Sequence, residues 1–284
     1  MLLADYVQRY ALENAVAVAT VLNYQRTERS YSRWLGRPAL LADLSDDGVN
    51  RWLVSLQDTG KAAATIKNER ANLLALWRAA YFSRLVEVKP DRIRKVHAPR
   101  TLPEAWDERQ LVALVTVALA VRGRIRAWRM PLAAFFRAYI LVGYDSGLRM
   151  SDMMALRWDQ LTADGSIAVS QQKTGWPVLC RLRPETMAAI DVIRDERRPT
   201  IFGGCLSRRA FFTAFQRIVK LAGLEGTSRK LRRTGASLLE RTQPGLAQHY
   251  LGHTSAKMAE TYYIDQRISR PNRPLPPPIG GEAV

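Results

Sequence analysis

The stretch VKPDRIRKVHAPRTLPEAW, residues 88–106, decides how this chain of 284 residues is organised. It contains Pro90, Pro99 and Pro103, and it interrupts the helical spacing of apolar residues found on both sides. Proline lacks a backbone N–H and restricts the residue before it, so three prolines favour an irregular connection. Within it, residues 91–103 carry the basic side chains Arg92, Arg94, Lys95 and Arg100. We therefore predict a basic linker over residues 91–103 that joins two domains.

Upstream of the linker, apolar residues recur at helical intervals. LSDDGVNRWLVSLQ, residues 44–57, begins with the capping candidate Ser45 and continues with apolar residues one turn apart. AAATIKNERANLLALWRAAYFSRL, residues 62–85, repeats this pattern, and no alternating strand pattern competes with it. We predict a helical N-terminal domain over residues 1–90.

Downstream of the linker, residues 104–270 predict a second domain that is mostly helical with one small antiparallel sheet. Two short apolar runs, at 165–170 and 176–182, flank QQKTG and predict a β-hairpin with Gly175 at its turn. The final residues, 271–284, are rich in proline and predict an extended or disordered tail. The predicted fold class is therefore mainly α, with a mixed α+β second domain.

Charge is the strongest compositional signal. The net charge is +17 and the isoelectric point is about 10.4, which indicates a polyanionic partner, with nucleic acid as the first choice. A membrane is not favoured, because the longest apolar run, 111–121, is too short to span a bilayer and the N-terminus lacks the pattern of a signal peptide. Two cysteines, Cys180 and Cys205, provide neither a disulfide framework nor a zinc site. We expect a soluble protein of a reducing, intracellular compartment.

Several basic residues lie beside turns where a backbone could meet a phosphate. Arg149 follows the Ser146-Gly147 turn, and Asp152 lies three residues on, where it could orient the guanidinium of Arg149. Lys173 lies in the turn of the predicted hairpin, where a lysine is equally often an exposed residue that only aids solubility.

SRKLRRTGAS, residues 228–237, predicts an arginine-rich helix. Such helices usually present a solvated face, but Leu231 anchors an apolar side here. Arg229 and Arg232 lie one turn apart, about 60° from each other around the helix. Two guanidiniums at this spacing could hold one phosphate from two sides.

Metal chemistry is not favoured by the sequence. The acidic pair Asp46-Asp47 suits a helix cap better than a cation site, and His249 and His253 lack the glutamate of a zinc protease motif. What remains is phosphoryl transfer in which arginines bear the charge and a side chain is the nucleophile.

The motifs that carry chemistry occur in a fixed order along the second domain. They are Arg149 in SGLRMSDMMAL, Lys173 in QQKTG, Arg232 in KLRRTGAS, His253 in LGHTS and Tyr262, nine residues after that histidine. This ordered set resembles the tyrosine recombinase (phage integrase) family over the whole second domain, and the first domain resembles that family's core-binding domain.

The resemblance implies a two-domain clamp on duplex DNA, monomeric when free and tetrameric on two sites with inverted-repeat cores. The implied reaction is cleavage and rejoining of DNA through a 3′-phosphotyrosyl intermediate, with neither ATP, metal nor any other cofactor. Accessory DNA-bending proteins are expected as further partners, and the bacterial cytoplasm or nucleoid as the location. Two alternatives stay open: a catalytically silent DNA-binding protein of the same fold, and a type IB topoisomerase-like enzyme that relaxes DNA.

The resemblance also implies a role for each residue. Tyr262, selected by the family's nine-residue spacing, is the nucleophile, with Tyr263 as a packing or backbone contact. The remaining catalytic set comprises Arg149, Lys173, Arg229, Arg232 and His253, supported by Asp152; Arg92, Arg94, Lys95, Arg100, Lys230 and Arg233 are expected to contact DNA. The arginines neutralise the phosphate, Lys173 protonates the leaving oxygen and His253 donates a hydrogen bond to the phosphate.

One position departs from the family pattern. Arg229 stands where the family usually has a histidine, three residues before the second arginine. Arginine stays charged and cannot accept the tyrosine proton. Water or another group must therefore take that proton, or the reaction is slower.

Overall fold

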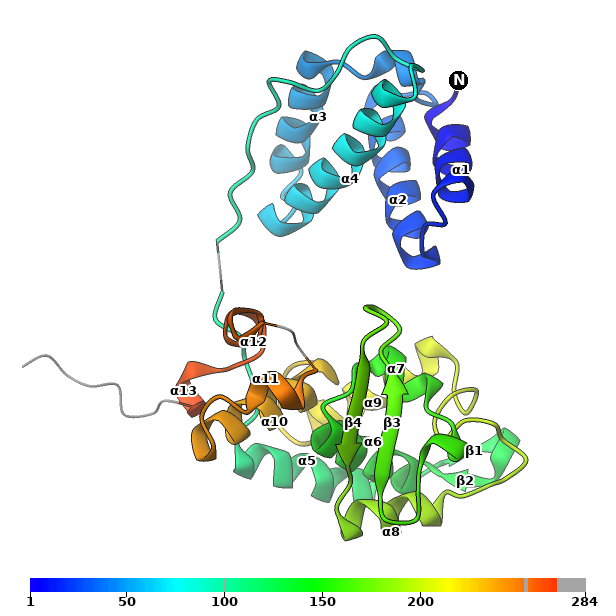
Figure 1. The fold of residues 1–284 in the computed structure, drawn as a ribbon, viewed down its shortest axis with the longest axis vertical. Coiled ribbons are helices and arrows are strands. Elements are labelled where there is room, and N and C mark those ends of the chain that lie inside the picture. Colours follow the sequence, from blue (N-terminus) through cyan, green and yellow to red (C-terminus); the bar gives the residue numbers. More distant parts are fainter. Residues whose placement is uncertain (100, 253–254, 270–284) are drawn as a thin grey trace, which may run out of the picture. The chain divides into compact units, whose positions relative to one another are not determined.

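A computed structural model describes residues 1–99, 101–252 and 255–269 (Figure 1). The chain divides into two compact units, the first spanning Met1–Thr101 and the second beginning at Leu102. Three predictions lie outside the described residues: Arg100 as a DNA contact, His253 as a catalytic residue and the proline-rich tail over 271–284.

Unit 1 is helical, as its periodicity predicts. Its helices are α1 (Leu3–Glu13), α2 (Val18–Leu35), α3 (Asp46–Asp58) and α4 (Ala63–Phe82). The predicted cap of α3 is present, because Ser45 Oγ accepts a hydrogen bond from the backbone N–H of Gly48 at 3.2 Å. The apolar faces of these helices meet around buried aromatic rings, with Tyr31 packed edge-on against Trp52.

The first part of the segment that we predict as a linker packs on unit 1. Ile93 joins the buried core of this unit. Asp46 accepts a hydrogen bond from the backbone N–H of Arg92 at 2.8 Å, and Asn50 accepts one from that of Arg94 at 2.9 Å. The backbone is thus fastened to α3, while the side chains of Arg92, Arg94 and Lys95 remain exposed.

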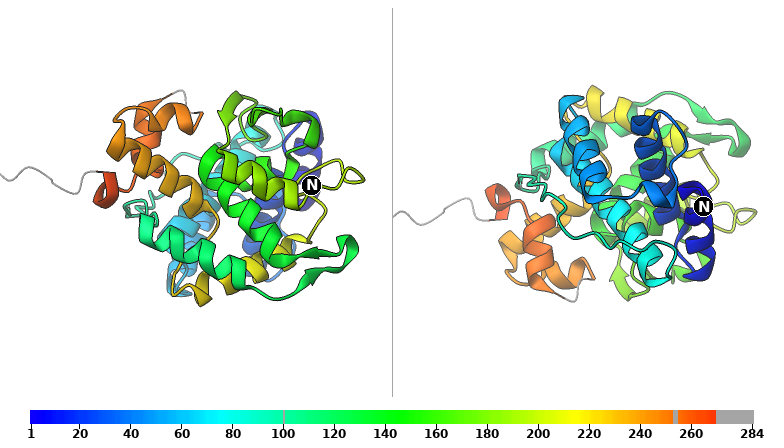
Figure 2. Two further views of the ribbon diagram at one scale, coloured as in Figure 1. Left: turned by 90° about the horizontal axis from the view of Figure 1, so that it is seen from below. Right: turned by 90° about the horizontal axis from the view of Figure 1, so that it is seen from above.

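Unit 2 surrounds the buried helix α6. Its helices are α5 (Glu108–Ala120), α6 (Leu132–Ser146), α7 (Met150–Ala155), α8 (Pro184–Val192), α9 (Arg208–Leu221), α10 (Arg229–Thr242), α11 (Ala247–Tyr250), α12 (Ala256–Tyr262) and α13 (Gln266–Ser269). Helix α6 contacts α5, α8 and α10. The ring centre of Tyr139 on α6 lies 4.8 Å from the ring centre of Phe211 on α9. Helices α11 and α13 gather beside α10 (Figure 2).

The predicted hairpin is confirmed. Strands β3 (Ser166–Ser170) and β4 (Pro177–Arg181) pair antiparallel, with Val169 opposite Val178 and both side chains buried. Gly175, the predicted turn residue, has φ +68°. A second pair, formed by β1 (Arg124–Ile125) and β2 (Met130–Pro131), was not predicted, because strands of two residues show no alternating pattern.

Two glycines make room for the ring of Tyr250 between α10 and the end of α6. The Tyr250 hydroxyl donates to the backbone oxygen of Tyr144 at 2.5 Å. A Cβ on Gly235 would lie 2.0 Å from that hydroxyl, and one on Gly147 would lie 2.6 Å from the ring. Gly147 also has φ +59°, a conformation that other residues rarely adopt.

We expect Gly235→Ala to destabilise the protein although alanine is the better helix former. Overpacking costs about 1–3 kcal/mol, which exceeds the gain of at most ~1 kcal/mol in helix propensity. Urea denaturation of the variant measures the change in the free energy of unfolding.

A double-mutant cycle gives the control for this prediction. In a Tyr250→Ala background the ring is gone and the backbone oxygen of Tyr144, 2.9 Å from the added Cβ, is the close atom that remains, so Gly235→Ala should cost less stability than in the wild type. An equal loss of stability in both backgrounds would contradict the packing explanation.

Candidate active site

Arg232 is the buried centre of the site. It lies in the first turns of α10 and is only 4% exposed. Its guanidinium donates to the backbone oxygen of Gly147 and, at 2.7 Å, to that of Leu251. Burial, together with the nearby charge of Arg149, lowers the pKa of Arg232 to about 10. The guanidinium therefore remains charged at neutral pH.

Arg149 is brought to the same place by a residue of the hairpin. It is the half-buried N-cap of α7, and its guanidinium donates to Gln171 Oε1 at 2.5 Å. Gln171 is 1% exposed, and its amide donates in turn to the backbone oxygen of Leu251 at 3.3 Å. Gln171 was not predicted as a site residue. The signal that could have found it is its position two residues after the inward-facing Val169, which puts a polar residue on the buried face of the hairpin.

Asp152 does not orient Arg149 in the way that the sequence analysis predicts. It is buried, and its Oδ1 accepts a hydrogen bond from the backbone N–H of Gln172 at 2.9 Å. The reason is that Arg149 is an N-cap with extended backbone angles, so the rule that residues i and i+3 share a helix face does not apply to it. Asp152 instead holds the hairpin residue next to Gln171.

The two adjacent tyrosines separate, and Tyr263 is the one that faces the arginines. Its ring lies 4.9 Å from the guanidinium of Arg232, whereas Tyr262, the last residue of α12, is 55% exposed. Burial alone would raise the pKa of the Tyr263 phenol. The charges of Arg232 and Arg149 and hydrogen bonds from both outweigh burial, so this pKa lies below its ordinary value.

The remaining predicted site residues differ in their exposure to solvent. Lys173 is exposed in the hairpin turn. Arg229 is exposed at the start of α10, one turn before the buried Arg232, and their joint hold on one phosphate stays a prediction. Arg233 is half-buried.

Lys230, predicted to contact DNA, has partners within unit 2. Its ammonium lies 3.2 Å from the carboxylate of Glu104 and 6.0 Å from the ring centre of Trp106. Its side chain is only 15% exposed. Lys230 is thus a contact inside the unit, because its flexible chain reaches back over the segment that precedes α5.

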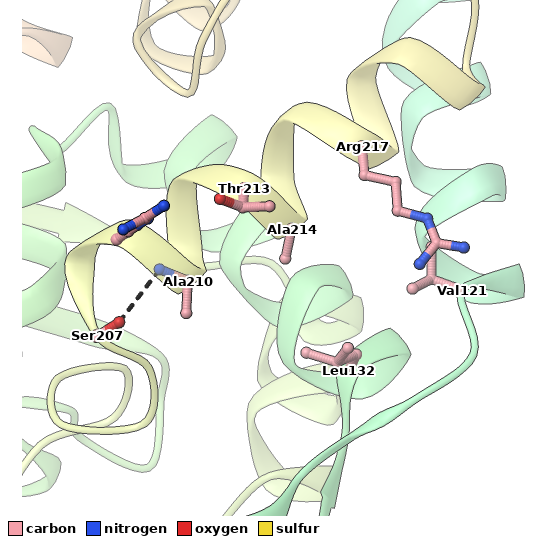
Figure 3. A pocket seen from close by; sticks show the side chains of 8 residues that line it. Val121, Leu132, Ser207, Ala210, Thr213, Ala214 and Arg217 are labelled. Carbon is pink, nitrogen blue, oxygen red and sulfur yellow. Dashed lines mark hydrogen bonds between the residues drawn. The ribbon is translucent and has the colours of Figure 1, made fainter.

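A pocket of about 470 Å³ lies elsewhere, between α9 and the ends of α5 and α6 (Figure 3). Its lining residues are Val121, Leu132, Ser207, Arg209, Ala210, Thr213, Ala214 and Arg217. None of the residues around Arg232 lines it, so it is separate from the arginine site. Among the residues that the structure describes, no three His, Cys, Asp or Glu side chains cluster closely enough to hold a metal ion. Within the same described ranges, none of the helices has the length and apolarity needed to cross a membrane.

Both units match models of the same protein family. Residues 87–268 match the Phage integrase family, and residues 3–82 match the Phage integrase, N-terminal SAM-like domain. The tyrosine recombinase XerD of Mycobacterium tuberculosis (strain ATCC 25618 / H37Rv) is 26% identical over 290 residues, which cover 92% of each chain.

Solved structures share the fold. A lambda integrase dimer bound to a COC′ core site has a TM-score of 0.72 and 22% identity, over 94% of this chain and 78% of that one. A lambda integrase tetramer bound to a Holliday junction has a TM-score of 0.68 and 21% identity, over 90% and 78%. The predicted fold class, mainly α with a mixed α+β second unit, is confirmed.

We expect Tyr263 to ionise early in an alkaline titration, before the ordinary phenol pKa of about 10. Because its folded pKa is lowered, its ionisation contributes stability that is fully present above the unfolded pKa and lost as pH falls through the folded pKa. The ultraviolet absorbance of tyrosinate measures the titration. Tyr263→Phe should remove the early transition, and the neighbouring Tyr262→Phe should retain it. An early transition that survives in Tyr263→Phe would assign the shifted phenol to another residue.

Proposed function

Because this chain belongs to the phage integrase family and is therefore a site-specific tyrosine recombinase, we propose that it binds duplex DNA and cuts one strand with Tyr262, while Arg149 and Arg232 hold the scissile phosphate. The observation that carries this proposal is the convergence of two guanidiniums, from α7 and α10, on one phenol. A phosphate oxygen placed where the Tyr263 hydroxyl lies would receive the same donors. Arginine is suited to this task, because its planar fork of N–H groups matches phosphate oxygens.

Tyr263 lies in the place that we propose for the phosphate. Tyr262 is the adjacent residue, and consecutive helical side chains point about 100° apart. When a phosphate displaces the Tyr263 hydroxyl, a turn of the short helix α12 (Ala256–Tyr262) by about this angle brings Tyr262 toward the arginines. The spacing of nine residues from His253 supports Tyr262 as the nucleophile.

The proposed reaction is a transesterification. The Tyr262 phenol oxygen bonds to phosphorus, the bond from phosphorus to the 5′ oxygen breaks, and Lys173 gives that oxygen a proton. The phenol proton leaves to water, because Arg229 cannot accept it. Arg149 and Arg232 stabilise the negative charge that builds on the non-bridging oxygens. Attack by a free 5′ hydroxyl on the phosphotyrosine then rejoins the strand and releases the tyrosine.

Partners and location are proposed from the relatives. We infer that inverted-repeat core sites are the substrate and that a tetramer assembles on two of them, in line with the lambda integrase assemblies on a core site and on a Holliday junction. Bacterial relatives support action on the nucleoid in the cytoplasm. The exposed side chains of Arg92, Arg94 and Lys95 are proposed backbone contacts. A silent DNA-binding protein and a topoisomerase-like enzyme are not favoured, because the curated relatives are recombinases.

Arg149→Ala should separate cleavage from binding. Loss of one donor to the transition state should raise the barrier by ~2.7–4 kcal/mol, which lowers the rate by about 10²–10³. Arg149 tests this better than Arg232, because Arg232 also holds the backbone at Gly147 and Leu251. Single-turnover cleavage and a gel-shift measurement of DNA affinity give the two quantities.

The exposed residue Arg122 is the matched control, because Arg122→Ala removes the same charge. The Arg122→Ala variant should cleave DNA at the wild-type rate. If Arg149→Ala lost binding and cleavage by the same factor, Arg149 would be an ordinary phosphate contact.

The tyrosine pair gives the test of the nucleophile. Tyr262→Phe should bind core DNA and form no covalent adduct on a nicked suicide substrate. Tyr263→Phe should form the adduct at least as fast as wild type, because the arginines no longer hold a hydroxyl that the phosphate must displace. A denaturing gel and peptide mapping of the trapped adduct provide the measurement. An adduct mapped to Tyr263 would instead make Tyr263 the nucleophile. Its contact with the arginines would then be a catalytic contact.

A further inference from the structure

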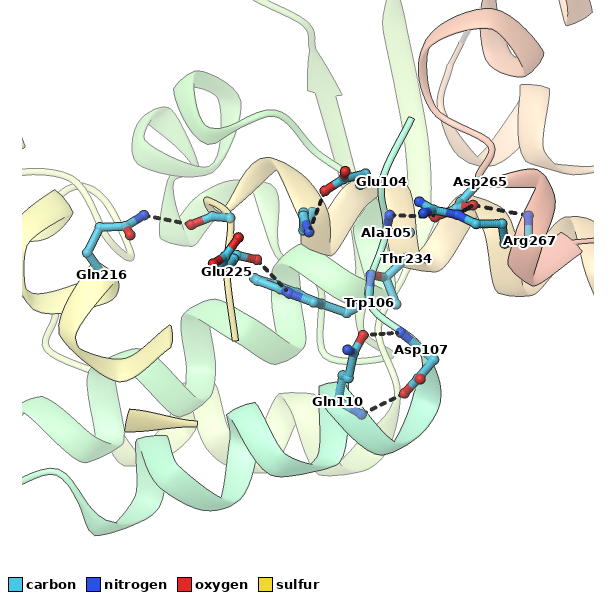
Figure 4. A network of polar contacts seen from close by, with 12 residues as sticks. Glu104, Ala105, Trp106, Asp107, Gln110, Gln216, Glu225, Thr234, Asp265 and Arg267 are labelled. Atoms are coloured by element: carbon cyan, nitrogen blue, oxygen red, sulfur yellow. Dashed lines mark hydrogen bonds and ion pairs between the residues drawn. The ribbon is translucent and has the colours of Figure 1, made fainter. Parts of the chain in front are cut away.

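Asp265 is a buried carboxylate that lies three residues after Tyr262. It is 2% exposed, and its Oδ2 accepts a hydrogen bond from the backbone N–H of Ala105 at 3.0 Å (Figure 4). Arg267 donates to both of its oxygens, at 2.9 and 2.8 Å. The backbone N–H of Asp265 donates to Ser237 Oγ on α10 at 2.8 Å. The chain is therefore fixed immediately after the tyrosines.

Helix α10, which carries Arg232, holds both the segment after the tyrosines and the segment before α5. Besides Ser237, α10 contributes Thr234, whose hydroxyl accepts a hydrogen bond from the backbone N–H of Trp106 at 2.9 Å. Ala105 and Trp106 are at the point where the chain enters unit 2 and precedes α5. Helix α10 thus joins three parts of unit 2: the phosphate-holding arginine, the entering segment and the segment that leaves the tyrosines.

Asp265 is charged when it makes these contacts. Burial alone would raise the pKa of its carboxyl, but hydrogen bonds from Arg267 and from the backbone N–H groups of Ala105 and Arg267 outweigh burial and lower this pKa. A buried carboxylate with several donors is a strong attachment, because hydrogen bonds to a charged group are stronger than neutral ones.

We propose that Asp265 is a positioning residue for the nucleophile, which anchors the C-terminal end of the tyrosine segment to Ala105 and α10 while Tyr262 and Tyr263 exchange places. This inference rests on the proposed function. Three residues of extended chain span at most about 11 Å. Tyr262 therefore stays within that distance of the anchor, while the exchange itself needs a shift of about one residue, 3.8 Å between Cα atoms. The anchor permits the exchange and keeps Tyr262 tethered to α10, the helix that carries Arg232.

The chain offers a matched control for this carboxylate. Asp195 forms the same local arrangement with Arg197, in which the guanidinium donates at 2.8 and 2.6 Å and the backbone N–H at 3.1 Å. Asp195 lies in the segment between α8 and α9, away from the tyrosines. Asp195→Ala therefore removes an equivalent aspartate–arginine pair that does not hold the tyrosine segment.

The experiment measures the single-turnover rate of adduct formation on a nicked suicide substrate at saturating DNA, and separately the Kd for the same DNA. We expect Asp265→Ala to lower the rate about ten- to a hundredfold, the range for loss of a hydrogen bond to a charged group, with an unchanged Kd. Asp265→Asn should recover part of the rate, because its amide oxygen still accepts from Ala105. Asp195→Ala should react at the wild-type rate.

The outcomes separate this inference from the proposed function. Wild-type cleavage by Asp265→Ala, an equal loss of rate and affinity, or the same loss in Asp195→Ala would each overturn the positioning role and leave the proposed function standing. If Asp265→Ala does not fold by circular dichroism, Asp265→Asn decides: a lower rate at unchanged Kd supports the role, and the wild-type rate overturns it. A wild-type protein that forms no adduct on its core site refutes the proposed function, and this inference with it.

Discussion

The burial of one positive charge, that of Arg232, organises unit 2. Removing a guanidinium from water costs several kcal/mol unless it is well hydrogen-bonded. The backbone oxygen of Gly147, at the C-terminal end of α6, helps to meet this cost, because that end of a helix carries partial negative charge. The backbone oxygen of Leu251 provides a second acceptor. These contacts tie Arg232 to the end of α6, where Gly147 caps the helix with φ +59°, and to the chain that approaches the tyrosines.

The chemistry of the site follows from how this charge is solvated. Carbonyl oxygens stabilise a cation without cancelling its formal charge, so the surroundings of Arg232 remain positive. Arg149 adds a second cation, and the lowered pKa of Arg232 reflects burial first and then the repulsion between the two guanidiniums. A phenol with a lowered pKa, that of Tyr263, is the group that such an environment favours. An anionic phosphate would be favoured for the same electrostatic reason.

Helix α10 serves the site on more than one face. Arg232 points to the acceptors at Gly147 and Leu251, while Thr234 and Ser237 contact the backbone of the segments that enter unit 2 and leave the tyrosines. Gly235 lies between them and permits the close approach of Tyr250. A single helix thus holds the charge and fixes the course of the chain around it. This arrangement explains why small and hydroxylated residues follow the arginines in RRTGAS.

Local sequence patterns were enough to predict the helices, the hairpin with its turn at Gly175, the cap at Ser45 and the candidate arginines, because periodicity, capping and turn chemistry involve residues close together in the chain. The ordered motifs of the sequence also determined the family. The folded chain was needed to show that Gln171 contacts Arg149, that Asp152 holds the hairpin and that Lys230 pairs with Glu104. It likewise decided that Tyr263 faces the arginines while Tyr262 is exposed. These outcomes depend on partners distant in sequence and on the rotation of a short helix, α12, about its axis. A one-residue difference in that rotation leaves the local pattern unchanged and exchanges the two tyrosines.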